Sequence, residues 1–346
     1  MKGLFKNDGA TTHSIMFHHF HNDVHPIGQG SISGHQFKQV IDWLDEKYNL
    51  LSADEYQSRL SQNRLEKDDI CLSFDDSLLC QFDIAVPILK KNNLRAFFFV
   101  YSLPICGTAS YLEVFRYFRT VAFSSVDEFF LLFFEKVQSI YGEEYFAEKK
   151  IFESKDLFSH IPFYTPNDKW FRYLRDDFLG KNKYHSLMLD IISDYNFKID
   201  EIKGKLWITN DHIKKLAEMG HTVGLHSYTH PMRIQDLPIE EQKEEYSKNL
   251  NHLEGLLGKG RITSMSHPCG NYNENILSYL GSLGIKIGFR SSMNVRSIKS
   301  SLEIPREDHA NILMLMKGRT AIKDGIRIRT RVTKADTRIG SHPVHK

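Results

Sequence analysis

Residues 70–77 read ICLSFDDS, and this short stretch decides the fold that the sequence predicts. Its apolar run is typical of a buried strand, and it ends in two adjacent carboxylates, Asp75 and Asp76. Two charges at the end of a core strand are costly unless a partner or a ligand compensates them. The pair therefore directs attention to polar residues elsewhere that could meet it.

Strand-like and helix-like segments alternate on both sides of this stretch. Such alternation predicts an α/β domain built on a largely parallel sheet. We expect strands at 13–17, 69–74, 95–102, 221–227, 261–266 and 285–290, a short run at 302–305, and helices near 34–48, 80–92, 209–220, 238–257 and 273–283.

The alternation stops between residues 107 and 206, a stretch rich in aromatic residues. Its apolar helical faces are too wide for free surface helices, so we interpret it as a helical insertion. It would either cover a site as a lid or enlarge the core. The remaining parts, 1–106 and 207–316, would form one discontinuous domain, and the basic stretch 317–346 would be a solvated tail.

Composition limits the classes of function. The chain has 346 residues with 41% hydrophobic and 25% charged residues, which is normal for a globular enzyme. A formal net charge of +2 gives no case for a nucleic acid or a membrane surface as partner. The start lacks the features of a signal peptide and no window is apolar enough for a membrane span, so we expect a cytoplasmic protein. The four cysteines form no CxxC pair and are expected to be reduced thiols.

Three of the expected strands end in residues that can bind a metal. Besides the aspartate pair, GLHSYTH ends in His226 and His230, four positions apart as on one face of a helical turn, and SHPCGNYN supplies His267. The carboxyl ends of parallel strands line a common site. Each pattern alone is weak, because an aspartate pair is usually a cap or a turn and such histidines are common on surfaces. Together they predict a metal site.

The residue types suit an open zinc site, in which two histidines and one carboxylate leave a position for water. The second carboxylate can then act as a general base toward that water. Zinc is the first choice from the ligand types, although cobalt, nickel or iron would also suit them.

These motifs resemble those of a known family. LSFDDS, GHTVGLHSYTH and SHPCGNYN are similar to the motifs of the polysaccharide deacetylase (NodB-homology) family, and SIMFHHF resembles the MYH opening of its biofilm poly-N-acetylglucosamine branch. The resemblance implies a distorted (β/α) barrel, one divalent metal ion and removal of acetyl from an N-acetylated sugar.

Carried over residue by residue, the resemblance implies roles for particular side chains. Asp75 would be the general base, and His18 would protonate the departing amine. The metal ligands would be Asp76, His226 and His230. Candidate substrate-binding residues are His21, His267, Pro268, Gly270, Asn271 and Arg306.

The sequence also departs from the family pattern. Ser77 replaces a glycine, a mild change if the backbone there keeps a negative φ. Ser266 replaces an arginine that orients the base, and Cys269 replaces an aromatic residue. No Leu-x-His motif follows. Arg306 could orient Asp75, or it could form a surface ion pair.

The leading expectation is a metal-dependent amidohydrolase that acts on an N-acetylated sugar, nucleotide-sugar or glycan in bacterial surface polysaccharide biosynthesis or modification. The missing signal peptide favours a nucleotide-linked or lipid-linked intermediate over an exported polymer. Two alternatives stay open: a hydrolase of another acyl amide, formyl or non-sugar, and a catalytically silent carbohydrate-binding protein. The sequence leaves the oligomeric state open.

Overall fold

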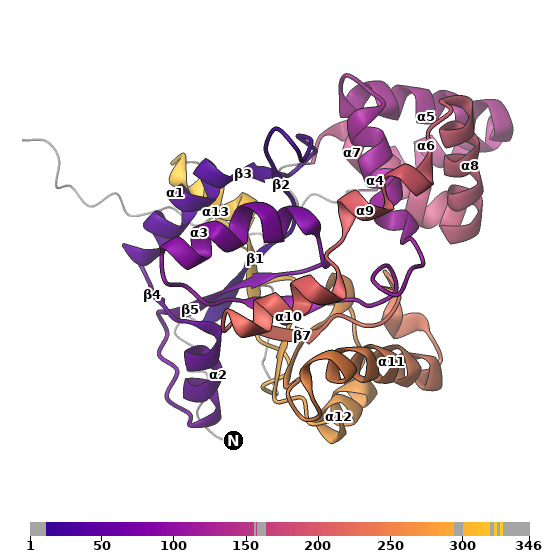
Figure 1. The fold of residues 1–346 in the computed structure, drawn as a ribbon. Coiled ribbons are helices and arrows are strands. Elements are labelled where there is room, and N and C mark those ends of the chain that lie inside the picture. Colours follow the sequence, from indigo (N-terminus) through magenta and orange to yellow (C-terminus); the bar gives the residue numbers. More distant parts are fainter. Residues whose placement is uncertain are drawn as a thin grey trace, which may run out of the picture.

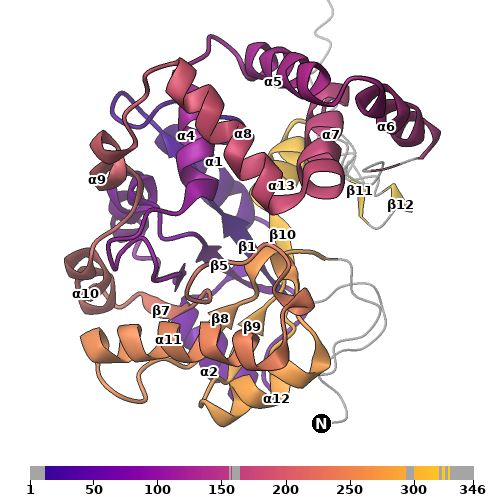
Figure 2. The same ribbon diagram turned by 90° about the vertical axis from the view of Figure 1, so that its right-hand side faces the viewer.

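The computed structural model describes residues 12–155, 157, 164–293 and 300–318, together with the backbone of residues 322–323 and 326–327. Its centre is a parallel sheet in the strand order β10-β1-β5-β6-β7-β8-β9, with β4 added beside β5. Figure 1 labels β4 and β5, and Figure 2 labels β8, β9 and β10. The strands are β1 (His13–Phe17), β4 (Asn49–Leu50), β5 (Asp69–Phe74), β6 (Phe97–Val100), β7 (Thr222–Leu225), β8 (Ser264–Ser266), β9 (Ile287–Phe289) and β10 (Arg306–Asp308).

The sheet closes on itself into a barrel. At one side β10 pairs with β1, and at the other Ile304 forms a parallel bridge with Phe289 of β9. Two backbone hydrogen bonds hold this bridge, from Ile304 N to Gly288 O at 2.9 Å and from Arg290 N to Ile304 O at 2.8 Å. The predicted barrel is therefore confirmed. The run expected at 302–305 contributes only this bridge, and the last strand begins two residues later, at Arg306.

Helices surround the barrel, and Figure 1 shows α1 and α3 on one side of the strands and α11 and α12 on another. In α1, four apolar side chains at helical spacing are buried, and a capping box between Ser33 and Gln36 starts the helix. The helices and the short segments beside them are β2 (Phe20–His21), β3 (Ile32–Ser33), α1 (Gly34–Asp45), α2 (Ala53–Ser61), the π-helical turn η1 (Gln81–Ala85), α3 (Val86–Lys91), α10 (Asn210–Glu218), η4 (Ile234–Asp236), α11 (Ile239–Leu257), η5 (Pro268–Gly270), α12 (Glu274–Ser282) and α13 (His309–Met316).

Stacked phenylalanines fix the level at which the central strands end. Phe17 pairs in register with Phe74, and Phe74 with Phe98, across β1, β5 and β6. Their rings stack with centroid distances of 5.4 Å and 4.7 Å. Such aromatic pairs add to the stability that burial gives. Because Phe74 directly precedes Asp75, this layer forms the floor beneath the two aspartates.

A group of helices is inserted between β6 and α10, where Figures 1 and 2 show it gathered at one end of the barrel. The chain returns from it at Trp207 and Ile208, which pair with Leu78 and Ser77 beside the aspartates. The inserted elements are α4 (Tyr111–Val121), α5 (Val126–Tyr141), α6 (Glu143–Ser154), α7 (Pro166–Tyr173), the π-helical turn η2 (Leu174–Leu179), α8 (Gly180–Asp194), η3 (Ile199–Glu201) and α9 (Lys203–Leu206).

Of the predicted basic tail, the structure describes Lys317, Gly318 and the antiparallel pair β11 (Ile322–Lys323) and β12 (Ile326–Arg327); the rest lies outside the described residues. Among the described residues, no helix has both the length and the apolar character that crossing a membrane requires.

Candidate active site

Asp76, His226 and His230 meet at the carboxyl ends of the strands. One carboxylate oxygen and two imidazole nitrogens lie within 4.8 Å of one another, a grouping that could hold a metal ion. Asp76 Oδ1 is 3.4 Å from Nε2 of His226 and 3.4 Å from Nε2 of His230. Asp76 follows β5 and the histidines follow β7, so the barrel brings together residues that are far apart in sequence.

The donor set fits a small divalent cation. Around a tetrahedral centre with metal–ligand distances near 2.0–2.1 Å, ligand atoms lie about 3.3 Å apart, close to the two separations of 3.4 Å between Asp76 Oδ1 and the histidines. Nδ1 of His226 lies 2.9 Å from the carbonyl oxygen of Ser266, to which it must donate, so Nε2 of the neutral ring presents its lone pair to the site. Burial alone would lower the pKa of His226, yet Asp75 and Asp76 raise it, which shows that positive charge is favoured here.

The loop from His226 to His230 is a turn, so the helical face expected from the spacing is wrong. Ser227 and His230 have positive φ angles of 63° and 58°. Ser227 Oγ accepts a hydrogen bond from the backbone N of His230 at 3.0 Å, and Glu245 of α11 accepts from the backbone N of Tyr228 at 2.9 Å. These bonds hold the second histidine beside the first.

Asp75 is held by a buried arginine. Nη1 and Nη2 of Arg306 donate to its two oxygens at 2.7 Å and 2.6 Å, and Arg306 is only 1% exposed. Burial alone would raise the pKa of Asp75, but the charge of Arg306, with that of His226, lowers it below its usual value. Asp75 is therefore ionised at neutral pH. Arg306 thus forms a buried ion pair with Asp75 and not the surface ion pair that the sequence had left open.

Ser266 explains how an arginine from another strand reaches Asp75. Its Oγ donates to Asp75 Oδ2 at 3.2 Å and accepts from Nη2 of Arg306 at 2.7 Å. The small serine on β8 leaves room for a guanidinium that comes from β10. An orienting arginine is thus present at a different position in the chain.

Ser77 does not have the negative φ angle under which its replacement of glycine would be a mild change. Its φ is +57° and that of Asp76 is +76°, so both residues lie in the left-handed region where glycine is normally preferred. The Ser77 hydroxyl accepts from the backbone N of Tyr101 at 3.0 Å and donates to the Tyr101 carbonyl at 3.2 Å. These two bonds compensate a strained backbone and tie β5 to the end of β6.

His18 follows β1 directly and lies beside the aspartates. Its charge is among those that lower the pKa values of Asp75 and Asp76, although burial acts on both in the opposite direction. The neighbouring His19 makes a 2.8 Å contact with Glu113 of α4. Two adjacent histidines thus lie at this side of the site.

Two of the expected substrate-binding histidines have other contacts. His267 is fully buried, its Nε2 lies 2.9 Å from the Leu302 carbonyl oxygen, and its ring stacks on Tyr272. Burial lowers its pKa to about 3, so it is a neutral core histidine rather than part of the pocket surface. His21 contacts Ser31 Oγ through Nδ1 at 2.8 Å. Neither belongs to the grouping of possible metal ligands.

Pro268, Gly270 and Asn271 form the short turn η5 and its end. Gly270 has a φ of +72°, and a Cβ there would lie 2.1 Å from Ser291 Oγ, so only glycine fits. Asn271 donates from Nδ2 to the Met232 carbonyl at 2.8 Å, which links this turn to the loop after His230. The residues of this turn are therefore required by the local structure. That they also contact the substrate stays a prediction.

Two residues beside the site were not identified from the sequence. Glu113 lies in the first turn of α4 and is buried. Tyr101 packs its ring 5.4 Å from that of His230 and accepts a 2.7 Å hydrogen bond from Trp207 Nε1. Tyr101 is hidden in an apolar run, and Glu113 belongs to an insertion without motifs. Trp170 and Trp207 are both buried, in keeping with a core role.

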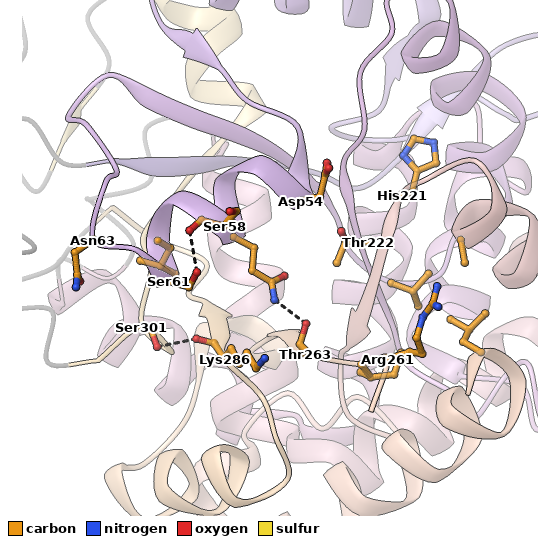
Figure 3. Close-up of a pocket in the computed structure, with 16 residues that line it drawn as sticks. Asp54, Ser58, Ser61, Asn63, His221, Thr222, Arg261, Thr263, Lys286 and Ser301 are labelled. Carbon is orange, nitrogen blue, oxygen red and sulfur yellow. Dashed lines mark hydrogen bonds between the residues drawn. The ribbon is translucent and has the colours of Figure 1, made fainter. Parts of the chain in front are cut away.

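A hollow lies at the opposite end of the barrel from the candidate site. It has a volume of about 690 Å³ and is lined by α2 and by residues at the amino ends of β7, β8 and β9, including Thr222 and Thr263 (Figure 3). Gln57 Nε2 donates to Thr263 Oγ1 at 2.7 Å within it. None of the predicted site residues lines this hollow, so its size alone does not make it the active site.

Comparisons with known proteins agree with this geometry. Residues 176–288 match the profile of the Polysaccharide deacetylase family, a stretch that includes both histidines but not the aspartates. No protein of curated function matches significantly.

Two solved structures share the fold. The Streptococcus pyogenes deacetylase PplD, in complex with acetate, is 17% identical, with a TM-score of 0.50 over 86% of this chain and 91% of that one. IcaB from Ammonifex degensii is 15% identical, with a TM-score of 0.51 over the same shares. The family resemblance is thus confirmed, whereas the MYH branch stays a prediction. Residues 176–288 thus match the polysaccharide deacetylase family, and the chain shares its barrel fold with PplD and IcaB.

Proposed function

We propose that this protein is a metal-dependent deacetylase that hydrolyses the N-acetyl group of an N-acetylated sugar in surface polysaccharide biosynthesis or modification. The single observation that carries the proposal is the pairing of two carboxylates with different partners. Asp76 faces two histidines, and Asp75 is held by Arg306. This division separates a metal ligand from a general base.

Asp76, His226 and His230 would hold the cation, and zinc is our first choice from the donor set. A divalent cation bound there would polarise the acyl carbonyl and increase the acidity of water.

Asp75 accepts a proton from the water that attacks the acyl carbon. Its bidentate bonds to Arg306 and its bond from Ser266 fix the carboxylate in place before substrate binds. His18 donates a proton to the sugar nitrogen as the carbon–nitrogen bond breaks, which leaves acetate and a free amine. General acid–base groups of this kind contribute about 10²–10⁴ in rate.

The retained base argues against a silent carbohydrate-binding protein. Keeping Asp75 ionised inside the barrel requires the buried Arg306, and breaking such a pair costs about 3–5 kcal/mol. A protein that only binds sugar has no need of this arrangement. A formyl or non-sugar amide remains the alternative substrate, because the acyl pocket decides between them.

The test is acetate release from a panel of free, nucleotide-linked and polymeric N-acetylated sugars, with bound metal measured in each protein. Asp75→Asn should retain metal and lose at least 100-fold in kcat. Asp69→Asn is the matched control, because Asp69 begins the same strand and pairs with Arg59 at the other end. Metal bound with no acetate from any sugar would refute the acetyl-sugar substrate, and wild type unable to bind metal would refute the site.

A further inference from the structure

Four arginines gather on the inserted helices. Arg116 and Arg119 lie on α4, Arg172 on α7 and Arg175 on the turn η2. Burial, together with the charges of the other three arginines, lowers the pKa of Arg119 to about 10. A gathering of like charges in a partly buried place opposes folding unless something compensates it.

Protein partners compensate this charge only in part. Among the described residues, Arg175 forms an ion pair with Asp176 at 2.6 Å, and Arg116 donates to the Gln29 carbonyl at 2.7 Å. The Nε atoms of Arg119 and Arg172 are buried without a hydrogen-bond partner. Such orphaned donors are rare in folded proteins and point to a missing acceptor.

Asp168, a carboxylate of α7 that acts on Arg172, already has other partners. Asp168 accepts from Thr165 N and Oγ1 at 3.0 Å through one oxygen, and from Gln29 Nε2 at 2.5 Å through the other. Burial lowers the pKa of Arg172 more strongly than Asp168 acts to raise it, so the pKa stays below its ordinary value. Asp168 therefore does not satisfy the two orphaned Nε donors.

Aromatic rings pack against the flat faces of these guanidinium groups but offer no acceptor to the N–H groups along their edges. The Arg119 Cζ lies 5.0 Å from the centre of the Phe171 ring, and the Arg172 Cζ lies 4.0 Å from that of Tyr164. Cation–π contact uses the face of the planar group. The N–H donors point outward along its edge, where they match the oxygens of a phosphate.

The cluster lies at the catalytic end of the barrel. The insertion leaves β6 at its carboxyl end, and Glu113, one turn before Arg116, contacts His19 at 2.8 Å. On the other side, the charge of Arg175 opposes the burial that raises the pKa of Cys269 in the turn η5. A cavity of about 90 Å³ adjoins Arg116 and Arg119, beside Gln29 and Ser125.

We propose that Arg116, Arg119, Arg172 and Arg175 bind a phosphate or diphosphate group attached to the sugar whose amide is hydrolysed. The proposal rests on the deacetylase function and specifies its substrate class. A single carboxylate would be matched by one bidentate arginine, whereas several arginines suit a multiply charged phosphate ester. A nucleotide diphosphate and a lipid diphosphate share this chemistry.

The first test measures binding of inorganic pyrophosphate by calorimetry to the metal-loaded protein. The double variant Arg119→Met/Arg172→Met should bind it about 100-fold more weakly than wild type, since a hydrogen bond to a charged group contributes about tenfold or more. The control is Arg95→Met, which removes an arginine that pairs with Asp54 near the opposite hollow. Pyrophosphate held by the metal alone would bind all three proteins equally, and that result would overturn the proposal.

Folding of the double variant is checked by its thermal transition. If it does not fold, the single variants Arg119→Lys and Arg172→Lys replace it. These variants keep the positive charge but lose the planar fork, so we expect about tenfold weaker pyrophosphate binding. Unchanged binding would overturn the proposal.

Acetate release then distinguishes the sources of phosphate. Wild type is assayed with UDP-N-acetylglucosamine, with N-acetylglucosamine linked through diphosphate to a short polyprenol, and with unphosphorylated tri-N-acetylchitotriose. Faster turnover of either phosphorylated sugar, lost in the arginine variants, supports the proposal and names the source. Arginine-dependent pyrophosphate binding without acetate release would uphold the anion site and refute the deacetylase. Preference for chitotriose together with no pyrophosphate binding would overturn the anion site alone.

Discussion

Arg306 reaches Asp75 from the last strand of the barrel, 231 positions further along the chain. Its guanidinium also donates to Ser266 Oγ and, through Nε, to the Arg290 carbonyl at 2.5 Å. The planar fork thus fixes the carboxylate in one orientation. A lysine would keep the charge but offers no fork, so it cannot replace these bonds.

We expect Arg306→Lys to lower kcat for acetate release by about 10–100-fold with little change in KM, because a misoriented base acts only on the chemical step. Metal content should stay at the wild-type level. Arg59→Lys provides the control, since Arg59 holds Asp69 at the other end of β5. An equal loss of kcat in both variants would show that the effect is structural rather than catalytic.

His221 makes stability depend on pH because it is buried in its neutral form. The backbone N of Ala96 donates to its Nδ1 at 3.1 Å, which requires an unprotonated nitrogen. Burial, with the charge of Arg95, lowers its pKa to about 4. The unfolded chain therefore binds this proton at a higher pH than the folded one.

Stability should consequently be complete above about pH 6.5 and fall by about 1.4 kcal/mol per pH unit between 6.5 and 4 as a result of this histidine alone. His221→Asn keeps an acceptor at the same position and should show a shallower decline. The measurement is the free energy of unfolding from urea titrations at several pH values. Parallel curves for wild type and variant would contradict the assignment.

At the scale of elements, α4 connects the inserted helices to the site. Its first turn places Glu113 against His19. Burial raises the pKa of the Glu113 carboxyl, but the charge and the hydrogen bond of His19 act in the opposite direction, and the pKa is lowered on balance. A carboxylate in the first turn of a helix is also favoured by the helix dipole. This pair connects α4 to the loop after β1.

We expect Glu113→Gln to weaken this connection, with less than a tenfold loss of kcat and a loss of about 1–3 kcal/mol in stability, because Glu113 supports the site without reacting. His18→Asn should instead lower kcat by at least 100-fold as the proton donor. Comparing both variants by kcat and thermal transition separates support from catalysis. A larger kcat loss in Glu113→Gln than in His18→Asn would transfer the acid role to the His19–Glu113 pair.

The elements that were predictable have strong local signals. The strands around β5 are continuous apolar runs, and α1 and α10 combine helical spacing with caps. The helix α2 buries few side chains, and α13 is too apolar all round to show a periodic face, so neither was identified. The turn at His226–His230 depends on positive φ angles and on Glu245, which spacing cannot show.

At the scale of the whole molecule, the site exists only because the barrel closes. Asp76 and His226 follow two strands that are separated by β6, while Arg306 lies on the strand that pairs with β1. Asp76, His226 and His230 stand in short, recognisable motifs, so their grouping could be predicted from the sequence. From the sequence, contact of Arg306 with Asp75 was only one of two possibilities, and Ser266 and Glu113 were not given their roles, because these contacts join distant parts of the chain and no local pattern encodes them.

A cation at Asp76, His226 and His230 would link the end of β5 to the loop after β7 and would neutralise two neighbouring carboxylates. Binding only to the folded state stabilises it by about 4 kcal/mol at a ligand concentration 1,000 times Kd. We therefore expect chelation to lower the thermal transition of wild type by several degrees, and re-addition of zinc to restore it. Asp76→Asn should be insensitive to both treatments, because a ligand is lost, whereas Asp75→Asn should respond like wild type, because Asp75 binds Arg306 instead. If the transition of Asp75→Asn also ignored the chelator, the division of roles between the two aspartates would be wrong, and both carboxylates would have to be assigned to the metal.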